Sequence, residues 1–287
     1  MYNNIVIGFD DSEFSRAALL ESTHWIKRHG GKAVLVHAVF FDEEEFAIAP
    51  NQREKRFELG KAICYRTQET FSSDFGLDGK LEAIVCEGEP HEVIVNVASE
   101  RNADLIAVGT HGRKGLKKLF MGSVTSRVIA SSPCDVMLVK KPCNLCLGEY
   151  QSILLSFDGS ELSKKALKRA CELSKIGGSE ITALYVIPHY EEMIEFFATS
   201  GIKESLLHDA QRIMQTAKEI ASSQEVIIKT EVAEGHAAEK IVETADRLKS
   251  DLIIRGPHGW SGVNKAIIGS IIENVIVNAS CPVLVVK

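Results

Sequence analysis

The segment GTHGRKGLKKLFMGS, Gly109–Ser123, and the segment GPHGWSGVNKAIIGS, Gly256–Ser270, repeat one pattern of glycines, G-x2-G-x9-G-S. The two copies begin about half a chain length apart in a protein of 287 residues. A period this long corresponds to a whole domain rather than to a solenoid repeat. A glycine loop that runs into a helix start directs main-chain N–H groups toward a bound anion. The pattern therefore predicts two copies of one phosphate-binding domain.

The segments around the glycine loops repeat in the same order. NNIVIGFDDS at 3–12 matches QSILLSFDGS at 151–160, ADLIAVGTHG at 103–112 matches SDLIIRGPHG at 250–259, and CDVMLVK at 134–140 matches CPVLVVK at 281–287. Apolar runs that alternate with helical segments are typical of a parallel sheet with helices on both faces. We therefore expect an α/β fold in two tandem domains, 1–142 and 150–287.

Local signals place several helix starts. Asp11 or Ser12 can cap a helix that runs from Glu13 to about Arg28, and Pro90 suits the first turn of another helix. A further helix is expected from about Ser123. In parallel sheets of this kind, ligands bind beyond the carboxyl ends of the strands, near the point where the strand order reverses.

Composition narrows the classes of function. Hydrophobic residues make up 45% of the chain and charged residues 25%, which is ordinary for a globular protein. The net charge is −6 and neither half is basic, so nothing indicates nucleic-acid binding. No apolar run reaches the ~18 residues of a membrane span, and the acidic N-terminus is unlike a secretory signal. Seven cysteines without a framework spacing favour reduced thiols, and we expect a cytoplasmic location.

Other motifs are absent or weaker. The chain has no G-x4-GK[ST] P-loop, and its glycine loop follows the fourth strand rather than the first, unlike the dinucleotide fold. Cys143 and Cys146 have metal-ligand spacing but no second pair, so we expect no metal site and keep a metal sensor as a weaker alternative. His91 and His111 are attributed to turns, and no catalytic residue is assigned.

The glycine pattern, together with IVIGFDDS at 5–12, GEPHEVIVNVA at 88–98 and GSVTSRVI at 122–129, resembles the ATP-binding branch of the UspA-type universal stress protein family. The resemblance covers both halves. It implies that each half is a Rossmann-like domain with a five-stranded parallel sheet of order 3-2-1-4-5. It also implies a stress-response or regulatory protein that binds ATP. Because the sequence has no P-loop lysine and no evident general base, we expect ATP hydrolysis to be slow at most. A Mg²⁺ ion at Asp10 or Asp158 beside the nucleotide stays open as an alternative to a bond between that carboxylate and the ribose.

The same resemblance implies a role for individual residues. Asp10 would face the adenosine, the main chain of Ala38 and Val39 would border the adenine, and Val108 and Gly109 would flank the ribose. The phosphates would be held by Gly112, Gly122, Ser123, Val124 and Thr125. The corresponding residues of the second half are Asp158, Val186, Arg255, Gly256, Gly259, Gly269 and Ser270.

The two copies then diverge. Thr125 is matched by Ile272, and a loop with four basic residues is matched by one in which Lys265 is the only cation, so we expect the first half to bind ATP more tightly. The final strands pair between subunits in this family, so we expect an intramolecular pseudo-dimer, and a homodimer stays open. Two alternatives remain: a slow nucleotide hydrolase or adenylyl-transferring enzyme, and a protein-interaction module with vestigial pockets.

Overall fold

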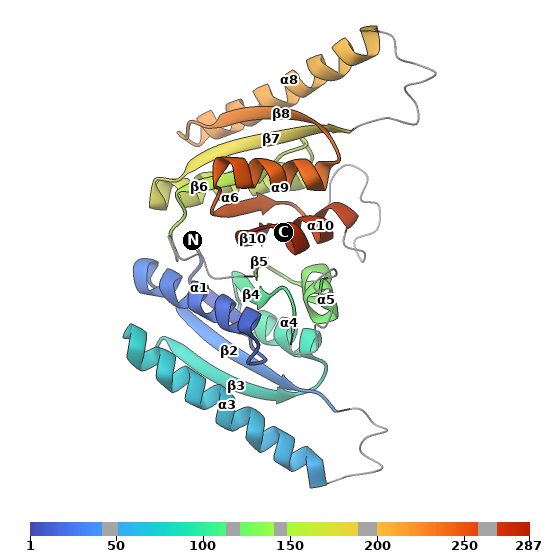
Figure 1. Ribbon diagram of the computed structural model, residues 1–287. Helices are drawn as coiled ribbons and strands as arrows, with labels where there is room; N and C mark the ends of the chain where they lie inside the picture. The colour runs from blue at the N-terminus through green and yellow to red at the C-terminus, as the bar shows by residue number, and fades with distance from the viewer. Residues whose placement is uncertain (42–50, 113–120, 141–147, 189–199, 258–268) are drawn as a thin grey trace. The chain divides into compact units, whose positions relative to one another are not determined.

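The structure is a computed structural model that describes residues 1–41, 51–112, 121–140, 148–188, 200–257 and 269–287 (Figure 1). The chain divides into two compact units, Met1–Glu149 and Tyr150–Lys287. Among the helices of these described ranges, none has the length and apolar character needed to cross a bilayer.

The first unit alternates strands with helices along the chain. Its elements are β1 (Asn4–Gly8), α1 (Glu13–His29), β2 (Lys32–Val39), α3 (Asn51–Phe75), β3 (Leu81–Glu87), α4 (Pro90–Glu100), β4 (Leu105–Gly109), α5 (Ser123–Ser131) and β5 (Asp135–Val139). The strands are all parallel and lie in the order β3-β2-β1-β4-β5. The predicted five-stranded sheet of order 3-2-1-4-5 is confirmed.

The second unit repeats this plan. Its elements are β6 (Ser152–Ser156), α6 (Glu161–Gly177), β7 (Glu180–Pro188), α8 (Ser200–Ser223), β8 (Lys229–Gly235), α9 (Ala237–Leu248), β9 (Leu252–Arg255), α10 (Ser270–Asn278) and β10 (Val283–Val285). Its strands are parallel in the order β8-β7-β6-β9-β10. The repeat read from the glycine loops is thus a repeat of whole folds.

Helices cover both faces of each sheet. In the first unit α1 contacts α3 on one face, and α4 contacts α5 on the other. In the second unit the corresponding pairs are α6 with α8 and α9 with α10. Because the sheets are buried on both sides, the central strands are continuous apolar runs rather than alternating ones.

The first helix of each unit begins at a serine cap. Ser12 Oγ accepts from Ser15 N at 3.2 Å, and Ser160 Oγ accepts from Ser163 N at 3.3 Å. The cap satisfies one of the amides that the first helical turn leaves unbonded. Of the two residues offered by the sequence, Ser12 is the cap, because Asp11 lies in the left-handed region with φ of 66°.

The last residues of the first unit are attached to α1. Gly148 N donates to Glu21 Oε1 at 3.1 Å, and His29 Nε2 lies 2.9 Å from Gly148 O. Glu149 forms an ion pair with Arg28. Gly148 has φ of 69°, and its main chain passes so close to α1 that a side chain there would overlap the helix backbone.

Candidate functional site

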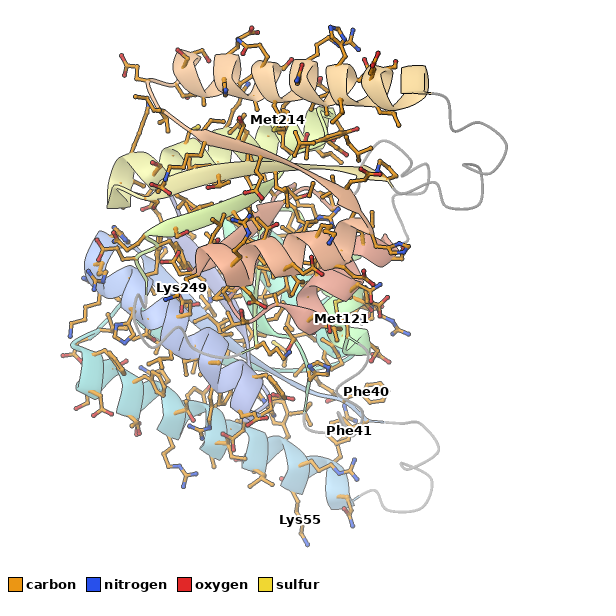
Figure 2. The ribbon with its side chains drawn as sticks, turned by 45° about the horizontal axis from the view of Figure 1, so that its top comes forward. Phe40, Phe41, Lys55, Met121, Met214 and Lys249 are labelled. Atoms are coloured by element: carbon orange, nitrogen blue, oxygen red, sulfur yellow. The ribbon has the colours of Figure 1, made fainter. Side chains whose placement is uncertain are left out.

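The strand order reverses beside β1 in the first unit, since β2 lies on one side of it and β4 on the other. The carboxyl ends of β1 and β4 therefore form the crevice where ligands bind in open parallel sheets. Phe40, which follows β2, and Met121, which precedes α5, lie at this same end of the unit (Figure 2). The residues predicted to bind a nucleotide in this unit come from the ends of β2 and β4, from the loops, and from the start of α5 at this edge.

Asp10 and Gly112 meet at the edge. Asp10 Oδ1 accepts from Ser12 N at 3.0 Å, which orients the carboxylate. A Cβ atom added to Gly112 would lie 2.9 Å from Asp10 Oδ2. The carboxylate is thus in contact with the main chain of the glycine loop, and these two predicted site residues are brought together.

Gly109 has a structural reason to be glycine. A Cβ atom at this position would lie 2.6 Å from Phe14 Cβ, 2.7 Å from Phe14 C and 2.8 Å from Ser15 N. The start of α1 therefore packs directly on the end of β4. The equivalent contact in the second unit is looser, with 2.9 Å between a Cβ on Gly256 and Leu162 Cβ. This close approach, which sequence reasoning missed, positions the loop whether or not a ligand is bound.

The start of α5 presents unbonded amides at the same edge. Gly122 is the N-cap, with φ of −60° and ψ of 141°, and no side chain caps the helix. Gly122 N donates to Thr110 O at 3.1 Å, and Ser126 N donates to Gly122 O at 3.0 Å. Within the described part of the chain, the amides of Ser123, Val124 and Thr125 donate to no acceptor. Three N–H groups and the positive end of the helix dipole are thus available to an anion.

The Thr125 hydroxyl has a partner within the protein. Thr125 is buried, and its Oγ1 donates to Gly109 O at 2.9 Å. A hydroxyl carries one proton, so a contact in which Thr125 donates to a phosphate would have to replace this bond. The main-chain N–H of Thr125 has no such competitor among the described residues.

His111 is a further candidate that the sequence analysis attributed to a turn. Its side chain is 5% exposed, its Nδ1 lies 3.0 Å from Thr110 Oγ1, and its ring packs on Phe14. Its Nε2 is buried and has no hydrogen-bond partner among the described residues. Buried polar atoms without partners are rare, so this nitrogen is a candidate to bond a ligand. The one signal in the sequence is a histidine at this place in both loops.

The residues predicted around adenine and ribose have buried or half-buried side chains, so only their main chain is open to a ligand. Val39 and Val108 are buried, and Ala38 is half-buried. Val108 Cγ1 would lie 2.9 Å from a Cβ on Gly8, so this side chain fills the core between β1 and β4. The peptide groups of these residues are what a nucleoside could contact.

The second unit has the same aspartate contact and glycine-capped helix as the first, but its helix start has fewer unbonded amides among the described residues. Asp158 Oδ1 accepts from Ser160 N at 2.9 Å, as Asp10 does from Ser12, and Val186 is half-buried. Gly269 caps α10 without a side-chain bond, but Ile272 N donates back to Gly269 O at 3.0 Å. The first turn of α10 therefore leaves the amides of Ser270 and Ile271 unbonded among the described residues. Gly259 lies outside the described residues.

Arg255 is the most unusual residue of the second site. It is 7% exposed, and its Nε donates to Gly256 O at 3.1 Å. Burial lowers the pKa of its guanidinium to about 10, and the nearby charge of Asp158 opposes that shift. The prediction that Arg255 flanks a ribose did not anticipate a buried cation at this point.

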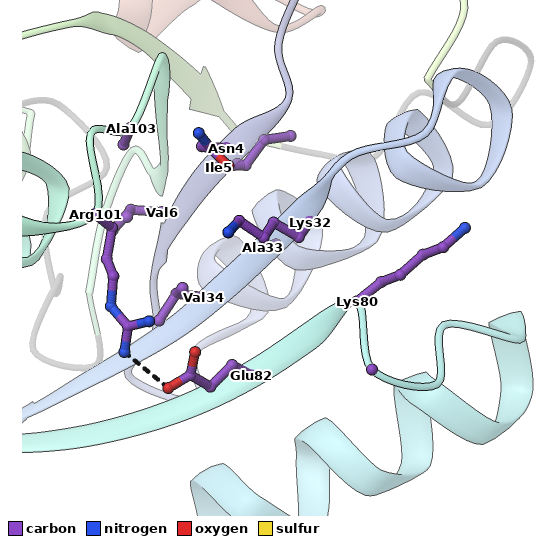
Figure 3. Close-up of a pocket in the computed structure, with 11 residues that line it drawn as sticks. Asn4, Ile5, Val6, Lys32, Ala33, Val34, Lys80, Glu82, Arg101 and Ala103 are labelled. Carbon is purple, nitrogen blue, oxygen red and sulfur yellow. Dashed lines mark hydrogen bonds and ion pairs between the residues drawn. The ribbon is translucent and has the colours of Figure 1, made fainter.

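A shallow pocket lies at the opposite end of the first unit's strands (Figure 3). It is lined from the amino ends of β1, β2 and β3, and an ion pair of 2.8 Å between Arg101 and Glu82 crosses it. No predicted site residue lines this pocket. Among the described residues no group of three or more His, Cys, Asp or Glu side chains could hold a metal ion. Cys143 and Cys146 lie outside the described residues.

Comparison with known proteins agrees with the fold. The model of the universal stress protein family matches residues 1–140 and again 149–287. A universal stress protein of Methanocaldococcus jannaschii is 38% identical over 141 residues, which cover 48% of this chain and 82% of that protein. Universal stress protein E of Photorhabdus laumondii is 23% identical over 301 residues and covers 100% of this chain and 95% of its own length.

One solved structure has the same fold over both units. It is a universal stress protein from Archaeoglobus fulgidus, which is 20% identical and superposes with a TM-score of 0.73. The alignment covers 99% of this chain and 96% of that structure.

Proposed function

Since the chain belongs to the universal stress protein family, we propose that it binds ATP at the carboxyl edge of the first unit's sheet and acts in regulation or stress response. The unbonded amides of Ser123, Val124 and Thr125, beside Asp10 and Gly112, carry this proposal. N–H groups without acceptors at a helix start favour an anionic ligand, because their positive ends and the helix dipole point toward it.

Each part of ATP has a partner at this edge. The phosphates meet Gly112, Gly122 and the α5 amides, and the basic residues at 113, 114, 117 and 118 add charge. Asp10 is held in place to accept from ribose hydroxyls, and the main chain at Ala38 and Val39 borders the adenine. Mg²⁺ prefers phosphate and carboxylate oxygens, so a Mg²⁺ ion would accompany the phosphates; a bond from Asp10 to that ion is the alternative to its bond with the ribose.

The first unit is the stronger site in this proposal. Counting bonds to described residues only, its helix start offers three unbonded amides and that of the second unit offers two. Its glycine loop has four basic residues, and the matching loop has Lys265 alone. The Thr125 hydroxyl supports this difference less than the sequence suggests, because it already donates to Gly109 O.

Proline at Ser123 tests the amide site directly. Gly122 has the extended conformation that precedes proline, and position 123 is the exposed first residue of α5, where proline is well tolerated. Ser123→Pro therefore removes one N–H without unfolding the helix. A lost hydrogen bond to a charged group costs ~1.5–3 kcal/mol, so the Kd for ATP should rise about tenfold or more. Titration calorimetry on the full chain measures it.

Two matched variants complete this test. Ser123→Ala removes only the hydroxyl and should change the affinity much less. Ser270→Pro makes the same change in α10, where Gly269 is also extended with φ of −64° and ψ of 140°, and should affect only the weaker site. A folded Ser123→Pro protein with unchanged ATP affinity, or a larger effect from Ser270→Pro, would contradict the proposal.

The output of the site is binding rather than turnover in this proposal. No motif in the sequence places His91 or His111 as a catalytic base. A Mg²⁺-dependent turnover above ~1 s⁻¹ would instead favour a nucleotide hydrolase or adenylyl-transferring enzyme. Failure of the purified chain to bind any adenine nucleotide would favour an interaction module with vestigial pockets.

We also propose that the two domains pair within the chain as a pseudo-dimer through their final strands. These strands are apolar, DVMLV at 135–139 and VLV at 283–285, and exposed apolar edges favour aggregation. Co-expression of residues 1–149 and 150–287 as separate chains should give a complex of the two in equal amounts. We also propose a cytoplasmic location, with which the lack of a disulfide bond among the five described cysteines is consistent.

A further inference from the structure

Arg255 is a buried cation that has a donor without a partner among the described residues. It ends β9 at the carboxyl edge of the second unit, and its Nε donates to Gly256 O at 3.1 Å. Its Nη1 is buried and has no hydrogen-bond partner in the described part of the chain. A guanidinium has five N–H donors and no acceptor. Such a group, left short of partners in the interior, is a candidate to bind an anion.

The fold does not require a charge at this position. The first unit places Val108 at the matching position, where it is 4% exposed in the core. Asp158 acts on Arg255 through its charge, yet Arg255 Nη1 has no hydrogen-bond partner among the described residues. A buried charged group that lacks hydrogen-bond partners costs free energy, and an apolar residue at the same place carries no such cost. The cost of keeping Arg255 therefore points to a use in recognition.

A paired exchange between the units links Arg255 to the residue of α10 that replaces Thr125. In the first unit Gly109 O accepts from Thr125, in the first turn of α5. In the second unit Thr125 is replaced by Ile272, and the matching carbonyl, Gly256 O, accepts from Arg255 instead. The carbonyl uses the Nε donor, and Arg255 Nη1 remains without a partner among the described residues, so it is available to a ligand.

The helix start adds donors of its own. The amides of Ser270 and Ile271 donate to no acceptor in the described residues, and α10 has no side-chain cap. A planar guanidinium can bind two oxygens of one phosphate group at once. One buried cation with two amides suits one phosphate group, whereas a triphosphate would also need the basic loop that only the first unit has.

We propose that the second unit binds the phosphate group of a nucleoside monophosphate, with Arg255 and the first amides of α10 as its ligands. The nucleoside part rests on the proposed function, and the phosphate contact rests on Arg255 and the unbonded amides of Ser270 and Ile271 in the described residues. The two units then differ in the ligand they take, triphosphate in the first and monophosphate in the second, as well as in affinity.

The test replaces Arg255 and Ile272 of the second unit by the residues that the first unit has at the matching positions, valine and threonine. Arg255→Val with Ile272→Thr removes the guanidinium and restores a threonine donor for Gly256 O. In the Ser123→Pro background, which weakens the first site, AMP and inorganic phosphate are titrated into the full chain by calorimetry. The double exchange should raise the Kd for AMP at least tenfold and leave the melting temperature without ligand unchanged or higher.

Each outcome decides one part of the proposal. An AMP affinity unchanged by the double exchange would overturn the role of Arg255, and so would a large fall in ligand-free melting temperature, because Arg255 would then be structural. Inorganic phosphate that binds as tightly as AMP would support the Arg255 contact and overturn the nucleoside part. ATP binding that depends on Ser123 is measured separately, so failure of the first site and failure of this inference are distinguished.

Discussion

Replacement of Gly109 by alanine is expected to destabilise the first unit by about 3 kcal/mol, because the added methyl group overpacks the start of α1. Its Cβ would lie 2.7 Å from Phe14 C and 2.8 Å from Ser15 N, which are backbone atoms that cannot rotate away. For a unit of this size the loss corresponds to a fall of roughly 10 °C in melting temperature. Thermal unfolding followed by circular dichroism, without nucleotide, measures it.

Two other glycines serve as controls for Gly109→Ala. In Gly256→Ala the added Cβ would lie 2.9 Å from Leu162 Cβ and 3.2 Å from Leu162 C, the nearest backbone atom. This substitution should therefore destabilise the second unit less than Gly109→Ala destabilises the first. Gly112→Ala meets only Asp10 Oδ2, at 2.9 Å, so it should weaken ATP binding with little effect on melting. A Gly109→Ala protein that melts like the wild type would show that the contact between β4 and α1 is not tight.

Gly148→Ala should destabilise the first unit at least as much as Gly109→Ala. We expect its free energy of unfolding to fall by about 4 kcal/mol, because the strain of the left-handed backbone and the overlap of the methyl group with α1 act together. Gly148 has φ of 69°, and its Cβ would lie 2.5 Å from both His24 C and Trp25 N. The segment would have to leave α1, which breaks the bond from Gly148 N to Glu21. Melting temperature and the rate of proteolysis near position 148 are the two measurements.

Gly76→Ala separates the two causes. Gly76 has φ of 65°, close to that of Gly148, but a Cβ there would have no neighbour within 4 Å. Gly76→Ala should therefore lower the free energy of unfolding by about 1 kcal/mol, which is the penalty for placing alanine in the left-handed conformation alone. If Gly76→Ala and Gly148→Ala lowered the stability by similar amounts, the close contact of Gly148 with α1 would not be a cause of the destabilisation.

Much of the fold could be predicted because its signals are local. The helix expected from Glu13 to about Arg28 runs from Glu13 to His29, and α4 and α5 begin at Pro90 and Ser123 as expected. Serines, prolines and glycines mark element ends through their own backbone and capping preferences. The sheet order followed from the resemblance of the whole pattern to a known family, and the strand pairings confirm it.

The candidate site was predicted less completely, because its geometry depends on segments far apart in the chain. Asp10 and Gly112 were both expected at the site, but their contact follows from the pairing of β1 with β4. The bond from Thr125 to Gly109 O has no local signature. The histidine that both loops share does not by itself indicate that His111 Nε2 lacks a partner among the described residues.

The sequence by itself determined that this protein is two copies of one α/β domain, each with a glycine loop leading into a helix. Periodicity, caps and repeated motifs are properties of neighbouring residues, so they can be read without coordinates. Only the tertiary structure decided why Gly109 and Gly148 must be glycine and how Arg255 replaces Thr125 as the partner of a loop carbonyl. Those facts depend on distances between segments that packing brings together, and a linear pattern does not contain them.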